Sequence, residues 1–429
     1  MRKEPAAMEH TNRTIRPLTQ QDLEAYLDIY LNAYPAYKTL DEACREHYRE
    51  KHRLELREDR QVQTVGLFEG DVLIATMKLI LFSMNCFGRM QTACGLMALE
   101  VHPLHKKQGA ALEMIRYFED YARRHGALLT LLLPFQISFY RRMGYGFAGK
   151  LYEYHLPTAV LPKPDGEARR HLRLLQPEDF DRVLACHSRF AAQNHGMVEK
   201  FEEEVRAART DIQVRRIGYC ADDGTLRGYV AYRFESASDT NYTRNRLSVE
   251  ELVYDDGVVL RALLGALKLQ EDLAQTVLLR TGEEDFHHLL EDPQDVSGNY
   301  IDYGFLQTNV SAIGTMFKLL DPAAFVTATA YRTLPQGTLT AAFCYRDEMA
   351  HRDCRTVLRF DGGRWSALPE EALAEVTVTC RQGDLASLLM ASCGLEGMVR
   401  LGAVAVTGPW QQLAQLLHYG QKPWLNSDY

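Results

Sequence analysis

Two stretches of this chain repeat the same order of apolar and polar residues. IRPLTQQDLEAYLDIY begins at Ile15 and LRLLQPEDFDRVLACH begins at Leu172. Each stretch predicts a short strand, a polar turn and an amphipathic helix. Aligned without gaps, the two share the pairs Arg16/Arg173, Leu18/Leu175, Asp22/Asp179 and Leu27/Leu184. Because a long unit occurs twice, the sequence predicts a duplicated domain.

A predicted β-hairpin follows each of these stretches. TVGLFEGDVLIATMKLILF from Thr64 carries the turn EGD, and RRIGYCADDGTLRGYVAYRF from Arg215 carries the turn DDG. Apolar runs on both sides of such turns are typical of paired strands. Strands and helices therefore mix in both halves, and we expect an α+β (mixed α/β) fold.

The chain from about residue 300 onward has a different pattern. Strand signals occur in TLTAAFCYRD, CRTVLRFDGGRWSAL, AEVTVTCRQGDL and LGAVAVTGPW. Helical signals occur near 384–392 and 410–418, and Gly-rich turns separate the strands. This region predicts a further α+β domain.

The segment VHPLHKKQGAALEMI, residues 101–115, predicts a strand end, a basic turn and a helix that starts at once. Small residues at Gly109 and Ala111 leave the backbone N–H groups of the helix start accessible. Unpaired N–H groups and the helix dipole both favour an anion there. Lys106 and Lys107 add positive charge, so the segment predicts a phosphate site.

The second half differs at the corresponding point. It has ELVYDDGVVLRALLGALKLQ from Glu251, which places Asp255 and Asp256 where the first half has Lys106 and Lys107. Two carboxylates repel a phosphate. We therefore predict that the second half lacks this site and instead packs against the first half, where it forms a wall of the first half's ligand pocket.

A second motif, FYRRMGYG from Phe139 to Gly146, follows LLLPFQIS. Together, the two segments resemble the core of the GNAT N-acetyltransferases, whose pyrophosphate loop has Arg/Gln-x-x-Gly-x-Gly/Ala. Lys106, Gly109 and Ala111 match that loop, with Lys in the first place. The FYRRMGYG run is similar to the Eis (enhanced intracellular survival) family of bacterial acetyltransferases.

The resemblance to Eis proteins covers the whole chain and implies a domain organisation. It implies a GNAT domain with the acetyl-CoA site at residues 1–155 and a degenerate GNAT-like domain at residues 156–298. A sterol-carrier-protein-like domain at residues 299–429 would follow. For that last domain we expect a scaffold function.

The resemblance also implies the residues that contact acetyl-CoA. The edge of the strand before the loop would bind the pantetheine arm and thioester, and the loop would bind the pyrophosphate. A small polar residue of some Eis proteins is replaced here by Pro134-Phe135, where only the backbone of Phe135 can contribute. The expected set is Leu99, Val101, Lys106, Lys107, Gln108, Gly109, Ala110, Ala111 and Phe135.

Amide formation requires an acid for the leaving thiolate and a base for the amine. Tyr140 matches the tyrosine that similar GNAT enzymes use as the acid, and its hydroxyl is protonated at neutral pH. For the base, the resemblance favours the α-carboxylate of Tyr429. Glu100, on the strand that meets the thioester, is the alternative, and Asp428 is a further carboxylate near the acceptor.

The acceptor amine is left open by the sequence. Tyr34 and Tyr37 follow the first helix, where Eis proteins have aromatic residues around the acceptor. Eis relatives acetylate aminoglycosides, lysine side chains and polyamines, so these classes are the expected acceptors. We expect direct transfer in a ternary complex, since the motif segments contain no cysteine.

The composition of the chain argues against several classes of protein. The net charge of −8 and a pI near 6.0 argue against nucleic-acid binding. The nine scattered cysteines indicate reduced thiols, and we expect neither a signal peptide nor a membrane span. The predicted location is therefore cytoplasmic. By resemblance, we expect a homo-oligomer, namely a hexamer.

Two other function classes were weighed. The chain could bind CoA or a lipid without turnover. It could be a metallohydrolase that uses the pairs His102/His105 or His287/His288, but no third ligand has a suitable spacing, so we expect no metal. A serine hydrolase is not indicated, because the chain has no Gly-x-Ser-x-Gly.

Overall fold

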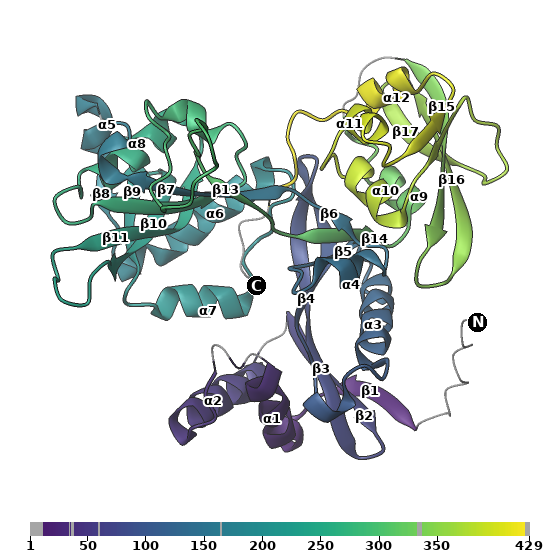
Figure 1. The fold of residues 1–429 in the computed structure, drawn as a ribbon, viewed down its shortest axis with the longest axis horizontal. Helices are drawn as coiled ribbons and strands as arrows, with labels where there is room; N and C mark the ends of the chain where they lie inside the picture. Colours follow the sequence, from purple (N-terminus) through teal and green to yellow (C-terminus); the bar gives the residue numbers. More distant parts are fainter. Residues whose placement is uncertain are drawn as a thin grey trace.

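The computed structural model describes residues 12–33, 35, 38–58, 61–163, 165–332 and 337–424. Within these residues the strands form two sheets of seven strands and one of five (Figure 1). We name them the first, second and third sheets in chain order. The mixed α/β architecture predicted from the sequence is confirmed. No helix of the described segments is long and apolar enough to span a membrane.

The first sheet has the strand order β1-β2-β3-β4-β5-β14-β6. Its strands are β1 (Arg13–Pro17), β2 (Val62–Glu69), β3 (Val72–Cys86), β4 (Arg89–Val101), β5 (Leu129–Leu132), β6 (Gly146–Phe147) and β14 (Met316–Leu319). The associated helices are η1 (Gln20–Asp22), α1 (Leu23–Ala33), α2 (Glu42–Glu58), η2 (Pro103–His105), α3 (Ala110–Arg124) and α4 (Ile137–Arg141).

The second sheet has the strand order β13-β7-β12-β11-β10-β9-β8. Its strands are β7 (Lys150–Pro157), β8 (Leu172–Leu174), β9 (Arg215–Cys220), β10 (Leu226–Ser236), β11 (Asn245–Tyr254), β12 (Thr276–Thr281) and β13 (Val310–Ile313). Its helices are η3 (Thr158–Val160), α5 (Gly166–His171), η4 (Pro177–Asp179), α6 (Phe180–Gln193), α7 (Glu202–Thr210), α8 (Gly257–Lys268) and η5 (Phe286–Leu289).

The third sheet has the order β17-β16-β15-β18-β19. Its strands are β15 (Thr338–Asp347), β16 (Arg352–Asp361), β17 (Arg364–Leu368), β18 (Val376–Thr379) and β19 (Ala405–Thr407). The helices around it are α9 (Pro322–Ala328), α10 (Gln382–Leu389), α11 (Leu395–Arg400) and α12 (Trp410–Leu417). The strands and helices predicted for this region are therefore confirmed.

The internal repeat has the same local structure in both copies. β1 and β8 each lead through a short 3-10 helix into α1 and α6. At matching positions, Thr19 N donates to Asp22 Oδ2 at 2.8 Å and Gln176 N donates to Asp179 Oδ2 at 3.0 Å. The repeated aspartate is therefore explained by helix initiation, because it accepts a hydrogen bond at each helix start.

β14 completes the first sheet from a distant part of the chain. It pairs antiparallel with β5, placing Phe317 opposite Leu131. β13, just before it, pairs with β7 in the second sheet, so residues 310–319 pass from one sheet to the other. The domain boundaries at residues 155 and 298 stay predictions. Residue 155 lies within β7, and β14 lies beyond residue 298.

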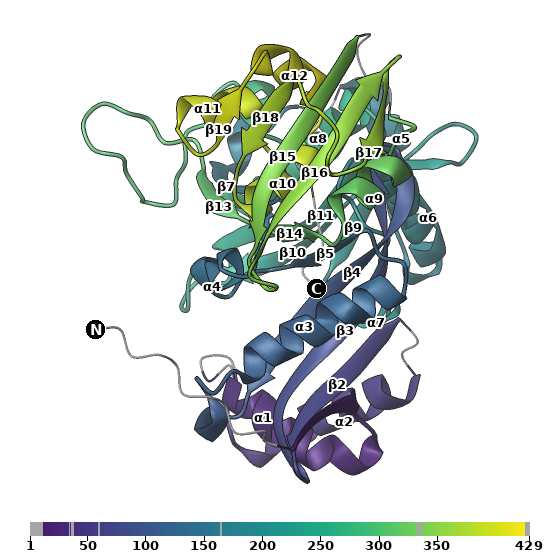
Figure 2. The same ribbon diagram turned by 90° about the vertical axis from the view of Figure 1, so that its right-hand side faces the viewer.

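Helices cover both faces of the first sheet. α3 lies across β3 and β4 (Figure 2), with Ile115, Phe118 and Ala122 fully buried as their helical spacing predicts. Leu112, on the same predicted face, is half-buried. α1 packs against β3 and β4 from the other side, and at the far end the core is continuous with that of the third sheet.

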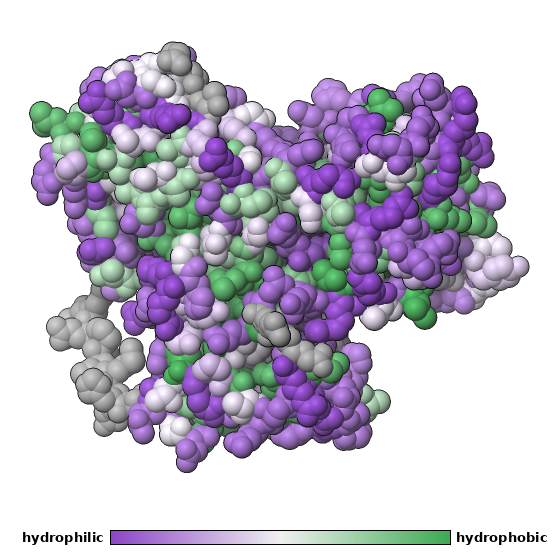
Figure 3. Space-filling view, turned by 180° about the vertical axis from the view of Figure 1, so that it is seen from behind, coloured by the Kyte–Doolittle hydropathy of each residue, from purple (hydrophilic) through white to green (hydrophobic). Residues whose placement is uncertain are grey.

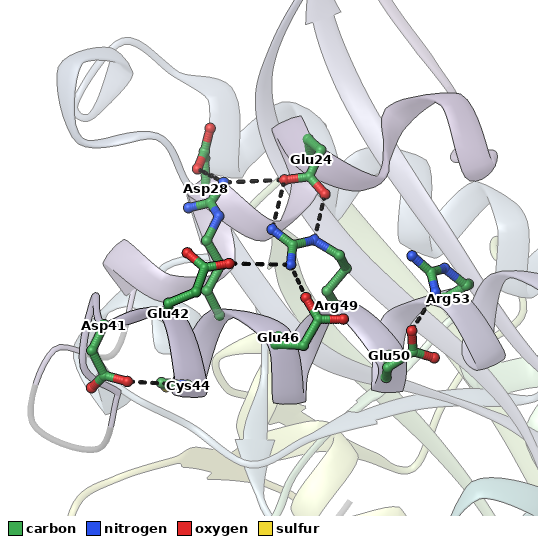
Figure 4. A network of polar contacts seen from close by, with 10 residues as sticks. Glu24, Asp28, Asp41, Glu42, Cys44, Glu46, Arg49, Glu50 and Arg53 are labelled. Atoms are coloured by element: carbon green, nitrogen blue, oxygen red, sulfur yellow. Dashed lines mark hydrogen bonds and ion pairs between the residues drawn. The ribbon is translucent and has the colours of Figure 1, made fainter.

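α2 packs beside α1 and has two different faces. Figure 4 shows ion pairs on its outer face, including Arg49 Nε to Glu24 Oε1 at 2.7 Å and Arg45 Nη2 to Asp28 Oδ1 at 2.6 Å. Such exposed pairs contribute little to stability. The inner face buries His52 and Glu55, which bond to each other at 2.8 Å, and His52 packs against Tyr26 of α1.

Candidate active site

The first sheet forks where β4 and β5 part. The two strands pair in parallel only from Ala93/Leu129 to Leu96/Leu132. β5 then ends, while β4 continues to Val101 through a bulge at Ala98, whose φ is +51°. The backbone of residues 97–101 is therefore not paired with β5. The strand edge predicted at Leu99 and Val101 is open on this side.

A cleft of about 470 Å³ lies in this fork. It gathers most residues predicted for acetyl-CoA and catalysis. These lining residues are Leu99, Glu100, Val101, Lys106, Lys107, Gly109, Ala110, Ala111, Phe135 and Tyr140. Gln108 does not line it, because its amide donates to Leu104 O and its carbonyl accepts from Arg13.

The start of α3 faces this cleft. Gly109 is left-handed with a φ of +85°, and no side chain of the described residues caps the N–H groups that follow. A Cβ at Gly109 would meet nothing within 4 Å, so the helix start is open. Free N–H groups, the helix dipole, and Lys106 and Lys107 fit an anionic ligand.

Tyr140 reaches the cleft from α4, which follows β5. The residue is 7% exposed, and its ring meets Phe139 edge-on at 5.1 Å between centroids. Tyr145 is fully buried, and its hydroxyl accepts a bond of 3.2 Å from Thr130 Oγ1. Tyr140 is therefore the residue of this motif that lines the cleft, and Tyr145 packs in the core.

The third sheet supports α4 from behind. Arg141, next to Tyr140, bonds through Nη1 to Asp384 of α10 at 2.8 Å. A Cβ on Gly146 would lie 1.8 Å from the carbonyl oxygen of Gly383, so only glycine permits this close approach. The third sheet and its helices therefore fix the position of Tyr140.

Glu100 is a buried carboxylic acid beside the same cleft. It is 2% exposed, and its Oε2 accepts a bond of 3.3 Å from Thr76 Oγ1. Its Oε1 has no hydrogen-bond partner within the described part of the chain. Burial raises the pKa of Glu100 to about 8, against the opposing effects of Lys38 and Lys78. The group can therefore gain or lose a proton near neutral pH.

A second cavity of about 800 Å³ adjoins the cleft and shares Leu96, Ala98, Leu133 and Phe135 with it. We call it the acceptor cavity. The second copy of the repeat contributes part of its wall through α7. Figure 3, which views the molecule from behind, shows apolar patches scattered over the central part of that face.

The sequence analysis missed the charged residues of this cavity. Of the described residues, Lys38, Lys51, Lys78, Glu203 and Glu204 line it. They come from distant segments, so no local motif contains them. The one available signal is the lysine within the apolar strand segment IATMKLILF, since a charge in a buried strand is unusual.

Trp424 anchors the last described residues between the first two sheets. It is 7% exposed and packs edge-on against Phe190, and its backbone N–H donates to His195 O at 2.8 Å. A Cβ on Gly282 would lie 2.2 Å from its ring, so the indole fills that space. Trp424 lines a small cavity that includes Leu133, which also lines the cleft.

Four predicted site residues, Tyr34, Tyr37, Asp428 and Tyr429, lie outside the described residues. The histidines weighed as metal ligands have other contacts. His102 Nδ1 accepts from Leu104 N, and His105 Nδ1 lies 3.7 Å from Glu69 Oε2. Across the described ranges, no group of three His, Cys, Asp or Glu side chains could hold a metal ion.

Comparison with known families decides the class of protein. Residues 14–148 match one family of acetyltransferase (GNAT) domains, and residues 196–306 match another. The chain is a GNAT-type N-acetyltransferase. GNAT domains use acetyl-CoA, and the open helix start and strand edge of the first GNAT domain fit that molecule. No curated protein matches the chain.

The fold of this GNAT protein is similar to several solved structures along nearly its whole length. A GCN5-related N-acetyltransferase from Anabaena variabilis has a TM-score of 0.78 at 14% identity, over 97% of this chain and 100% of that one. A GCN5-related N-acetyltransferase from Kribbella flavida has a TM-score of 0.73 at 19% identity, over 97% of this chain and 98% of that one. Eis1 from Mycobacterium abscessus has a TM-score of 0.72 at 20% identity, over 97% of this chain and 100% of that one.

Proposed function

We propose that this protein transfers an acetyl group from acetyl-CoA to a primary amine by direct attack in a ternary complex. One observation carries the proposal. A single fork between β4 and β5 brings together an open helix start, an open strand edge and Tyr140, and it adjoins a second cavity for the amine.

The chemistry follows from these positions. The N–H groups at the start of α3, with Lys106 and Lys107, bind the pyrophosphate, and the edge of β4 aligns the pantetheine arm. The amine nitrogen forms a bond to the thioester carbonyl carbon, and the carbon–sulfur bond breaks. Tyr140 donates its proton to the departing sulfur, and a base accepts the proton that the amine loses.

Two groups are proposed for the base. Glu100 lines the cleft and has a pKa of about 8, which suits proton transfer near neutral pH. The resemblance favours the carboxylate of Tyr429, and Trp424 holds the preceding chain near Leu133 at the cleft. Adding residues after Tyr429 distinguishes the two groups, since full activity in such a variant would assign the base to Glu100 or to water.

The remaining expectations belong to the same proposal. We propose that the third sheet and its helices form a sterol-carrier-like scaffold, which is supported by the contact of α10 with α4. The chain is also proposed to assemble as a homohexamer without metal, nucleic acid or membrane.

The test is acetyl-CoA-dependent release of free thiol with a panel of aminoglycosides, polyamines, lysine peptides and free amino acids. Thiol release together with an acetylated amine, detected by mass spectrometry, supports the proposal. If acetyl-CoA binds but no amine in a broad panel is acetylated, the chain is a CoA-binding module and the proposal is wrong.

A further inference from the structure

The charges around the acceptor cavity indicate which amines it takes. Of the described residues, three lysines and two glutamates line it, and the rest of its lining is mainly apolar. The lysines are Lys38 on the segment before α2, Lys51 on α2 and Lys78 on β3, and the glutamates are Glu203 and Glu204 on α7.

Lysines of the chain already engage both of these carboxylates. Glu203 lies 3.3 Å from Lys51 Nζ and 3.4 Å from Lys78 Nζ. Glu204 accepts a bond of 2.7 Å from Lys200 Nζ. The glutamates are therefore largely neutralised, and little negative charge is left to attract a second cation from solution.

Lys78 and Lys51 also meet Glu55, which lies behind the cavity. Lys78 Nζ is 2.8 Å from Glu55 Oε2, and His52 bonds to the same oxygen. Although burial opposes it, these partners hold the pKa of Glu55 down at about 2, so it stays charged. Glu55 fixes the position of Lys78 but does not line the cavity.

Lys38 and Lys51 are placed to meet a ligand. Lys51 has a side chain that is 43% exposed, and its Nζ lies 3.3 Å from Glu203 and 3.9 Å from Glu55, so a ligand carboxylate would share Lys51 with these glutamates. Lys38 is buried against the ring of Tyr30, with Nζ 3.0 Å from the ring centroid. Burial lowers the pKa of Lys38 to about 8 despite Glu100, and a bound anion would favour its charged form.

We propose that the acceptor is an amine that also carries a carboxylate, as a free amino acid does, and that Lys38 and Lys51 bind this carboxylate. This inference rests on the proposed function. Three lysines stand against two glutamates in the lining, so an amine with only positive charges would meet an excess of like charge there. An amino acid instead offers a carboxylate to the lysines. The apolar wall, with Met97, Phe201 and Ile313, accommodates a side chain.

The test compares each of several amino acids with its own carboxamide in the thiol-release assay. The pair differs only in the carboxylate, and the lower amine pKa of the amide favours the amide, so the comparison is conservative. We expect kcat/KM to be at least roughly tenfold higher for the acid. Lys38→Gln and Lys51→Gln should reduce this ratio towards one, mainly through KM. Lys163→Gln, an exposed lysine elsewhere, should not.

Product binding gives a readout that does not need turnover. N-acetyl-L-phenylalanine and its amide are titrated into the CoA-saturated protein, where the acid should bind roughly tenfold more tightly and lose that advantage in Lys51→Gln. Equal binding of the two, or faster turnover of carboxamides and polyamines than of amino acids, overturns the inference while leaving N-acetyl transfer intact. Acid-selective product binding without turnover of any amine instead overturns the proposed function.

Discussion

The two GNAT domains have the same fork but fill it differently. In the first, β4 and β5 part around an open cleft. In the second, β11 and β12 pair in parallel only from Arg246 to Ser248 on β11 before they part. Trp424 packs there, against Gly282 directly after β12 and in one cluster with Val253 of β11. The shared topology provides the fork, and a few side chains decide whether it stays open.

The helix starts differ in the same way. α3 begins after Gly109 without a side-chain cap among the described residues. α8 begins after Asp256, whose Oδ1 accepts from Val258 N at 2.9 Å and Val259 N at 3.0 Å. In the second domain a carboxylate of the chain occupies the place that we assign to a phosphate in the first. Local helix capping can therefore remove an anion site.

The largest expected effect concerns the proposed acid, Tyr140, which lines the open fork of the first domain. Tyr140→Phe should lower kcat by about 100-fold or more, since the leaving thiolate loses its proton donor. Acetyl-CoA affinity should change little. Stopped-flow or steady-state thiol release measures the rate, and Tyr145→Phe is the control that removes a neighbouring hydroxyl. Unchanged turnover in Tyr140→Phe would remove it as the acid.

The second effect concerns the filled fork. Trp424→Ala should lower the free energy of unfolding by about 3 kcal/mol, because it leaves a cavity against Gly282 and Phe190. Urea denaturation measures it. Trp424→Phe, which keeps most of the volume, should lose clearly less. If both variants were as stable as the parent chain, the indole would not be what fills the second fork.

The third effect concerns the open helix start. Gly109→Asp gives α3 a carboxylate like that of α8 and should weaken acetyl-CoA binding at least roughly tenfold through like-charge repulsion. Gly109→Asn is the matched control, because it has the same backbone strain at a φ of +85° and no charge. Calorimetric titration measures both. Equal affinities in the two variants would show that charge at this position is unimportant.

The smallest expected effect at neutral pH concerns Glu100, which has a raised pKa. The folded chain favours the neutral form of Glu100. The stability that this protonated group contributes is therefore fully present below the ordinary pKa of a glutamate, and it is lost as pH rises towards about 8. As pH rises from 5 to 8.5, the free energy of unfolding of the parent should therefore fall relative to that of Glu100→Gln. Urea denaturation at both values measures this.

The rate of Glu100→Gln tests whether it is the base. If Glu100 accepts the proton, the parent enzyme should gain kcat/KM as pH rises through about 8, and the variant should lose that rise. An unaltered pH profile in the variant would assign the base to Tyr429 or to water.

The spacing of residues in short sequence motifs was enough to predict much of the cleft between β4 and β5. The loop from Lys106 to Ala111, Tyr140 and the aspartates of the second domain are short patterns whose chemistry depends on near neighbours in sequence. Pairing of β4 with β5 then brings the loop and Tyr140 into one fork. Glu100 was identifiable because it lies on the strand that enters the same loop.

Long-range arrangement was not predictable in this way. Lys51, Lys78 and Glu203 meet only because α2, β3 and α7 pack around one cavity. β14 lies beyond the second repeat and yet completes the first sheet, and its buried Lys318 bonds to Glu119 at 2.8 Å on α3. The sequence contains the residues, but their partners are set by tertiary packing.

The most direct test of this account is the number of acetyl-CoA molecules that one chain binds, measured by isothermal titration calorimetry. We predict one site per chain. Gly109→Asp should weaken this site, whereas Asp256→Ala should leave it unchanged although it costs about 1 kcal/mol of stability. Two equivalent sites per chain, or undiminished binding in Gly109→Asp, would contradict the claim that the first fork alone holds acetyl-CoA.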